Sequence, residues 1–287
     1  MSDYSDGFWQ SRDGLKLHYR DYAGAARADR PPVICLHGLT RNARDFAGLA
    51  SRASPDWRVI CLEMRGRGES AYAKDSATYT PLQYLDDFKH FLDQAGIDRF
   101  VAIGTSLGGI ITMLAALQMQ DRIAGAVLND VGPVLEPEGL RRIGAYVGQG
   151  RTFPTWMHAA RALGDAHRPA YPDFQVADWL AMAKRLMALS GNGRIVFDYD
   201  MKIAEPFADM NPDEQPDMWP CIDALAGRPI SILRGARSDI LSEATFAGMQ
   251  SRLPGVEAVT IDSVGHAPTL DEPEAVGAID RLLARIA

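Results

Sequence analysis

The sequence has no long apolar run, no cluster of basic residues and no leader-like beginning. No apolar stretch of the 287 residues approaches the roughly 20 that span a bilayer, so we expect no membrane segment. The net charge of −7 and the lack of a basic run argue against nucleic acid or an anionic membrane as a partner. Met1-Ser-Asp-Tyr-Ser-Asp6 has neither a basic start nor an apolar core, which predicts no secretion signal.

Cysteine is also scarce. Cys35, Cys61 and Cys221 are widely spaced and odd in number, so they fit neither a disulfide framework nor a zinc site. We therefore expect no metal and a reducing, cytoplasmic location. Cys35 and Cys61 lie in apolar runs, which predicts buried packing rather than catalysis for both thiols.

What the sequence does contain is a regular alternation of strand-like and helix-like segments. An exposed antiparallel pair is expected first, at residues 8–10 and 15–22 around a turn at Asp13-Gly14. Apolar runs typical of central strands follow at 32–36, 58–62, 99–103, 123–128, 229–233 and 256–261. Because helical patterns separate most of these runs, the sequence predicts an α/β fold with a mostly parallel sheet.

This alternation stops between about residues 133 and 216. Helical patterns at 138–147, 155–163 and 176–190 occur there, and no convincing central strand. We expect a helical cap lying across the carboxyl edge of the sheet, where open α/β sheets bind ligands. The predicted division is a core of residues 1–132 and 217–287 and a cap of residues 133–216. The cap is rich in methionine and tryptophan, which favours an apolar pocket where some of them face inward.

The segment Gly104-Thr-Ser-Leu-Gly108 joins an apolar strand directly to a helical run. A strand that enters a helix through one residue requires small side chains two positions before and after the turn, and both are glycine here. The turn places the Ser106 hydroxyl over the amino end of a helix, where backbone N–H groups favour negative charge. This is the context expected of the G-x-S-x-G nucleophile elbow.

A serine nucleophile needs a base, and histidine is the usual one. His266 lies in Ser263-Val-Gly-His-Ala-Pro268, the loop between the last strand and the last helix, at the same carboxyl edge as Ser106. We therefore assign the base to His266. The other histidines are expected on an exterior strand (His18), in a loop-shaping position (His37), in an amphipathic helix (His90) and in the cap (His158, His167).

The base in turn needs a carboxylate that fixes its tautomer. Asp239 follows the strand ending at Leu233, and the order Ser106, Asp239, His266 is the one expected for this elbow. Asp130, at the end of an earlier strand, is the competing acid. We favour Asp239 and interpret Asp130 as a capping or loop-shaping carboxylate.

Two fixed donors are needed to hold an oxyanion. The backbone N–H of Leu107 follows the nucleophile and supplies one. The loop after the strand at 33–36 should supply the second, and there we choose the N–H of Leu39. The glycine-punctuated run from Arg65 to Ser70 lacks phosphate-binding spacing and is interpreted as a structural turn.

Taken together these motifs resemble the α/β-hydrolase fold superfamily over essentially the whole chain. The matching pieces are His37-Gly38, Arg65-Gly-Arg-Gly-Glu-Ser70, Gly104-Thr-Ser-Leu-Gly-Gly109, Arg234-Gly-Ala-Arg-Ser-Asp239 and Gly265-His-Ala-Pro-Thr-Leu-Asp-Glu-Pro273. The resemblance implies an eight-stranded sheet, a helical cap after the sixth strand and no cofactor. Ser106 argues against the relatives with aspartate at the elbow. Glu63 stands where many relatives carry aspartate, which we interpret as a structural substitution.

The resulting prediction is a serine hydrolase that cleaves a carboxylic ester or lactone of a small to medium apolar substrate through an acyl-enzyme. A hydrolase of carbon–carbon bonds in aromatic ring-cleavage products would use the same triad and is the first alternative. A ligand sensor with a slow triad is the alternative from another class. The partner expected is a small-molecule substrate, and the sequence leaves the oligomeric state and the pocket residues open.

Overall fold

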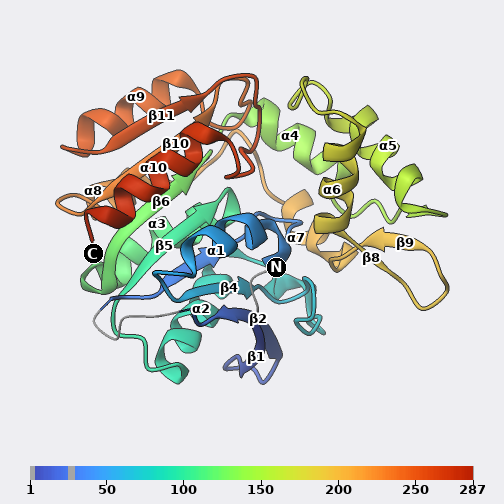
Figure 1. Cartoon of the computed structure of the whole chain (residues 1–287), viewed down its shortest axis with the longest axis horizontal. Helices are drawn as coiled ribbons and strands as arrows, with labels where there is room; N and C mark the ends of the chain where they lie inside the picture. The colour runs from blue at the N-terminus through green and yellow to red at the C-terminus, as the bar shows by residue number, and fades with distance from the viewer. Residues whose placement is uncertain (1–3, 25–29, 287) are drawn as a thin grey trace.

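The computed structural model describes residues 4–24 and 30–286 (Figure 1). The prediction made for the beginning of the chain, residues 1–6, therefore falls partly outside these ranges. In the described ranges, no helix has the length and apolar character that crossing a membrane requires.

The main sheet has eight strands in the order β1-β2-β4-β3-β5-β6-β10-β11. They are β1 (Ser5–Gln10), β2 (Lys16–Tyr22), β3 (Val33–Leu36), β4 (Val59–Glu63), β5 (Phe100–Thr105), β6 (Ile123–Asn129), β10 (Ile230–Gly235) and β11 (Glu257–Ile261). Strand β2 pairs antiparallel with β1 and β4, and every other pairing in this sheet is parallel. The predicted α/β fold with a mostly parallel eight-stranded sheet is confirmed.

The register of the central strands brings three loops to one point. Thr105, the last residue of β5, is paired with Asn129, the last residue of β6. On the other side of β6, Leu233 of β10 is paired with Asn129. The residues that follow β5, β6 and β10 therefore lie side by side at the carboxyl edge of the sheet, where ligands of open α/β sheets bind.

Helices flank the sheet on both sides (Figure 1). They are α1 (Ala47–Ala53), α2 (Pro81–Gln94), α3 (Leu107–Met119), α8 (Trp219–Asp223), α9 (Glu243–Arg252) and α10 (Pro273–Ala284). Short 3-10 helices are η1 (Ala43–Phe46), η2 (Ser76–Thr78), η3 (Gln120–Arg122) and η4 (Met201–Ile203). One apolar core contains buried residues of α2, α3, α8 and α9, and a second contains those of α1 and α10, so each face of the sheet has its own core.

Residues 133–216, here named the insertion, form four helices and a small sheet beside the main sheet (Figure 1). The helices are α4 (Pro137–Tyr146), α5 (Trp156–His167), α6 (Val176–Leu186) and α7 (Ala204–Ala208). The small antiparallel sheet has the order β7-β9-β8, with β7 (Thr152–Phe153), β8 (Met187–Leu189) and β9 (Ile195–Phe197). The domain division at residues 133 and 216 stays a prediction.

The helix predicted over 176–190 is too long. Helix α6 ends at Leu186, and the chain continues as strand β8 into a hairpin with β9. The hairpin turn is Ser190-Gly-Asn-Gly-Arg194, in which Gly193 has φ of 78° and the Ser190 N–H donates to the Arg194 carbonyl. The backbone becomes extended at Met187, and the glycines at 191 and 193 form the turn that lets β8 pair with β9.

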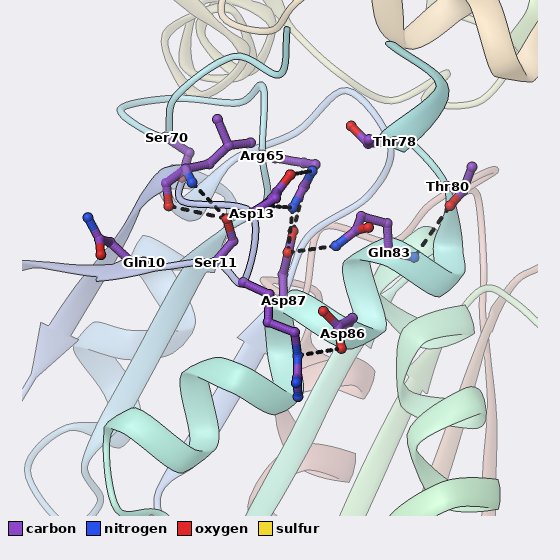
Figure 2. Close-up of polar contacts among 12 residues, drawn as sticks. Gln10, Ser11, Asp13, Arg65, Ser70, Thr78, Thr80, Gln83, Asp86 and Asp87 are labelled. Carbon is purple, nitrogen blue, oxygen red and sulfur yellow. Dashed lines mark hydrogen bonds and ion pairs between the residues drawn. The ribbon is translucent and has the colours of Figure 1, made fainter. Parts of the chain in front are cut away.

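A buried arginine fastens the edge of the sheet to α2 (Figure 2). The guanidinium of Arg65 donates two hydrogen bonds to Asp87 on α2, at 2.7 and 2.6 Å, and two to Asp13 in the β1–β2 turn, both at 2.9 Å. The side chains of Arg65 and Asp87 are fully buried. Burial raises the pKa of Asp87 although Arg65 opposes this, whereas the hydrogen bond from Arg65 lowers the pKa of Asp13. The glycine-punctuated run therefore has the structural role that the sequence predicted.

Candidate active site

Ser106 occupies the turn between β5 and α3 with φ of 51° and ψ of −113°, a strained backbone for a residue other than glycine. The turn holds because its two glycines are in close contact with backbone. A Cβ on Gly104 would overlap the carbonyl of Gly108, and a Cβ on Gly108 would overlap the carbonyl of Leu36. Both glycines therefore have the structural role that the sequence predicted.

The imidazole of His266 lies between Ser106 and a carboxylate. Its Nε2 is 2.9 Å from Oγ of Ser106, and its Nδ1 is 2.7 Å from Oδ2 of Asp130. The side chain of His266 is 9 % exposed and that of Asp130 is fully buried. An Nδ1–H donated to the carboxylate leaves Nε2 free to accept the serine proton, which is the arrangement a general base requires.

The buried carboxylate of Asp130 is held by the loop after β10. Its Oδ1 accepts the N–H of Gly235 at 2.8 Å, and its Oδ2 accepts the hydroxyl of Ser238 at 2.7 Å. These bonds and the His266 N–H stabilise a negative charge that would otherwise be costly to bury. Asp130 itself has φ of 56°, so the chain turns sharply at the end of β6.

The preference for Asp239 over Asp130 is corrected by this geometry. Asp239 pairs with Arg142 of α4 instead, through Nη2–Oδ1 at 2.8 Å and a second bond between Nε and Oδ2. Burial opposes the charge of Asp239, but the hydrogen bonds and charge of Arg142 outweigh it and lower its pKa. Chain order favoured Asp239, yet the adjacency of β5 and β6 places the residue after β6 nearer the serine.

The two residues chosen to donate backbone N–H groups to the oxyanion, Leu39 and Leu107, both line the cavity that Ser106 borders. Leu107 begins α3, and Leu39 lies in the loop after β3. Among the described residues neither N–H donates a hydrogen bond, so both are free to receive an oxyanion. The assignment of Leu39 and Leu107 as oxyanion donors stays a prediction.

Buried polar side chains fix the shape of the Leu39 loop. His37 donates from Nδ1 to the Gly38 carbonyl at 2.7 Å and accepts the Met64 N–H at Nε2 at 3.0 Å. Burial, with the Arg67 charge added, lowers the pKa of His37 to about 4, so this ring is neutral. His37 therefore shapes the loop, as expected. Arg67 donates to the Leu39 carbonyl at 2.9 Å, a contact that no motif in the sequence predicted.

Residues of the insertion bind the loop that contains His266. The Tyr171 hydroxyl donates to the Ala267 carbonyl at 2.8 Å, and the Ala170 carbonyl accepts the Gly265 N–H at 2.6 Å. From the core side, Asn129 donates to Thr105 and to the Pro268 carbonyl at 3.0 and 2.9 Å. These contacts hold His266 from both sides. No motif in the sequence pointed to Tyr171, whereas Asn129-Asp130 at the end of a buried strand was a usable signal.

An apolar cavity of about 290 Å³ opens beside Ser106, between the main sheet and the insertion. Its walls include Leu39 and Leu107 of the core together with residues of the insertion. The insertion contributes Leu135, Leu140, Ile143, Ile203, Pro206, Phe207 and Met210. Of the cap methionines, Met210 faces this cavity, Met182 a smaller one that also reaches Ser106, and Met157 is exposed.

A family model described as the alpha/beta hydrolase family matches residues 33–279 of this sequence. The chain belongs to the alpha/beta hydrolase family. The matched residues include the elbow, both candidate acids and His266. This alpha/beta hydrolase covers most of the length of each relative described below.

Two named relatives and one solved structure illustrate the similarity. The chain is 33 % identical to a 3-hydroxybutyrate-oligomer hydrolase of Cupriavidus necator, covering 93 % of each chain. It is 26 % identical to a 2-(acetamidomethylene)succinate hydrolase of Mesorhizobium japonicum, over 85 % of this chain and 84 % of the other. A crystal structure of an alpha/beta hydrolase from Novosphingobium aromaticivorans is 61 % identical, has a TM-score of 0.95 and covers 99 % of each chain. Family and relatives together identify a hydrolase.

Proposed function

We propose that this alpha/beta hydrolase cleaves a carboxylic ester through an acyl-enzyme on Ser106. The observation that carries the proposal is the hydrogen-bonded series Ser106 Oγ, His266 and Asp130, with contacts of 2.9 and 2.7 Å at the two ring nitrogens. A serine, a base and a buried carboxylate in this order form a nucleophilic triad, whatever the order of the residues in the chain.

In the first half of the reaction, Nε2 of His266 takes the proton of Ser106 as Oγ bonds to the ester carbonyl carbon. The N–H groups of Leu39 and Leu107 hold the oxyanion, and Asp130 stabilises the charged imidazole. The oxyanion then reforms the carbonyl, the bond to the alcohol oxygen breaks, and His266 gives that oxygen its proton. Water repeats the sequence on the acyl-enzyme, with His266 again as base, and releases the acid and free Ser106.

The cavity beside the serine favours a small to medium apolar substrate. A volume of about 290 Å³ suits a short chain or a single ring, and its walls are mainly aliphatic and aromatic. The name of the Cupriavidus necator relative also describes a hydrolase of ester-linked units. A lactone presents the same carbonyl and leaving oxygen within one ring, so we include lactones. The three buried, free cysteines favour the predicted cytoplasmic location.

The test is burst kinetics on p-nitrophenyl esters of short acids. We expect a burst stoichiometric with enzyme, and its loss in Ser106→Ala. Ser251→Ala is the matched control, because Ser251 is an exposed residue near the end of α9 whose hydroxyl donates to the Gly248 carbonyl. A fluorophosphonate should label wild type and Ser251→Ala but not Ser106→Ala. Failure to label Ser106 in the folded protein would refute the proposal.

Assays with vinylogous diketones test the alternative of a carbon–carbon bond hydrolase. Turnover of these diketones without turnover of the esters would support that alternative. Single-turnover hydrolysis with a large rise in melting temperature on ligand binding would favour the sensor.

A further inference from the structure

Ser106 borders a second cavity, of about 50 Å³, which shares Leu39, Ser106 and Ile143 with the apolar one. His266 and Ala267 line this second cavity and do not line the apolar cavity. A third cavity, of about 90 Å³, continues outward from it, and both are lined by Thr40, Arg41, Tyr146, His167 and Leu186. A substrate bound across Ser106 would therefore have one part in the apolar cavity and another in the cavity that Arg41 and His266 line.

Arg41 is the charged residue of the second cavity. A methyl group on Gly38 would lie 3.3 Å from Cγ of Arg41 and 3.7 Å from Cβ of Ser106, so both side chains border the same gap. The Arg41 N–H donates to the Gly38 carbonyl at 3.1 Å, which ends the Leu39 turn at this arginine. The arginine is thus placed by the same turn that presents the oxyanion N–H.

Arg41 is held in its charged form, because burial opposes the charge but Asp45, Tyr171 and Tyr146 outweigh this effect and raise its pKa. In the part of the chain that the structure describes, it forms one long ion pair, with Asp45, in which Nη1 and Oδ1 are 3.4 Å apart, and its side chain is 23 % exposed. Among the described residues lining the second and third cavities there is no aspartate or glutamate, while Arg151 adds a further positive charge. The nearby Arg142 is neutralised by Asp239.

The neighbouring positive charges also affect the pKa of His167. Burial, with the charges of Arg41 and Arg142 added, lowers its pKa to about 4, so the imidazole is neutral at physiological pH. A neutral imidazole and the hydroxyl of Tyr146 can each donate one hydrogen bond to an anion held by the arginine.

Resting on the ester hydrolysis proposed above, we infer that Arg41 binds a carboxylate carried by the alcohol part of the substrate. The leaving oxygen takes its proton from His266, so the alcohol must lie on the His266 side, in the second cavity. The acyl group then occupies the apolar cavity. The substrate class is an apolar acyl ester of a short hydroxy acid.

Three model esters test this assignment: O-butanoyl-3-hydroxybutyrate, its primary amide, and mono-sec-butyl succinate, which carries the carboxylate on the acyl arm. We expect wild-type kcat/KM to be about 10- to 100-fold higher for the first than for the other two, through KM. Arg41→Gln should lose this preference and Arg41→Lys should keep part of it. Arg141→Gln, whose guanidinium is 56 % exposed on α4, is the matched control and should keep all of it.

A preference that survives in Arg41→Gln, or a wild type that favours the acyl-arm carboxylate, would overturn the inference while leaving the esterase proposal intact. If no ester is cleaved and Ser106 is unreactive to fluorophosphonate, the proposed function fails instead. Calorimetric titration with 3-hydroxybutyrate still tests the site in that case: binding weakened about tenfold or more in Arg41→Gln supports it, and equal binding refutes it.

Discussion

The carboxylate of Asp130 lies 2.7 Å from Nδ1 of His266, although 136 residues separate the two in the chain. Asp130 follows β6, the strand next to the one that ends at the nucleophile. The loop after β10 contributes the N–H of Gly235 and the hydroxyl of Ser238 to that carboxylate. The loop expected to supply the acid therefore positions it.

The first prediction separates the two acids. Asp130→Asn should lower kcat by about 10⁴-fold, because an amide cannot stabilise the imidazolium and promotes the wrong tautomer. Asp239→Asn breaks only the pair with Arg142 and should change kcat by less than tenfold. Steady-state kinetics on a p-nitrophenyl ester measure both, with circular dichroism as the check on folding. The reverse ranking would restore Asp239 as the acid.

The second prediction concerns Ser238 as a positioning residue. Ser238→Ala removes a 2.7 Å hydrogen bond to the buried carboxylate, and bonds to charged groups are worth about 1.5–3 kcal/mol. We expect kcat to fall about tenfold or more with KM nearly unchanged, because the substrate does not meet this hydroxyl. Ser238→Thr keeps the hydroxyl and should restore much of kcat. If Ser238 had only a structural role, Ser238→Ala would lower the melting temperature without lowering kcat selectively over KM.

A third prediction addresses the glycine behind the nucleophile. Gly108→Ala places a methyl group against the Leu36 carbonyl, which is backbone and cannot move aside, so we expect a loss of about 3 kcal/mol or more in unfolding free energy. Gly191→Ala has open space around it and should stay within about 0.5 kcal/mol of wild type. Urea unfolding compares the two. Equal stabilities would show that the elbow tolerates a side chain.

The parts of the site that sequence alone predicted are those fixed by local geometry. Ser106 between two glycines, and His266 after the last strand, depend on short-range rules about turns and strand ends. The choice between Asp130 and Asp239 depends on which strands are neighbours, and chain order carries that information poorly. Both acids lie at the carboxyl edge of the sheet, so the order of the strands determines which of them reaches His266.

Other features depend on contacts between distant segments. His18 was expected on an exterior strand, but it is 1 % exposed, because its ring is enclosed by Glu63 on β4 and Asp6 on β1. The alternation of apolar and polar residues along β2 predicted a half-exposed strand and could not reveal these two carboxylates. Glu63 also accepts the N–H groups of Ala43 and Glu69, which supports its interpretation as structural.

The fourth prediction tests the buried ion pairs of Arg65. Arg65→Ala leaves the fully buried Asp87 without its partner, so unfolding free energy should fall by about 3–5 kcal/mol. Arg12→Ala is the matched control, since Arg12 pairs with Asp86 on the same helix at 63 % exposure and such pairs contribute about 0–1 kcal/mol. Chemical denaturation measures both variants. A small effect of Arg65→Ala would mean that water reaches Asp87.

The last prediction is a pH dependence of stability from His18 and Glu63, whose Nδ1 and Oε2 lie 2.8 Å apart. Burial opposes both charges, but mutual pairing and further hydrogen bonds outweigh it, so the pKa of His18 is raised above 6.5 and that of Glu63 is lowered below 4.5. The raised His18 pKa adds stability that is complete below pH 6.5 and is lost as pH rises through its folded value. The lowered Glu63 pKa adds stability present above pH 4.5 and lost on acidification.

The pair therefore contributes most between about pH 4.5 and 6.5. His18→Gln keeps a donor for Glu63 but carries no charge at any pH. Relative to this variant, wild-type unfolding free energy should be highest near pH 5.5 and should decline towards pH 9 as His18 loses its proton. Urea unfolding of both proteins across this range measures the difference, in which the contributions of groups that do not interact with His18 cancel. Parallel curves would contradict a charged His18 in the folded protein.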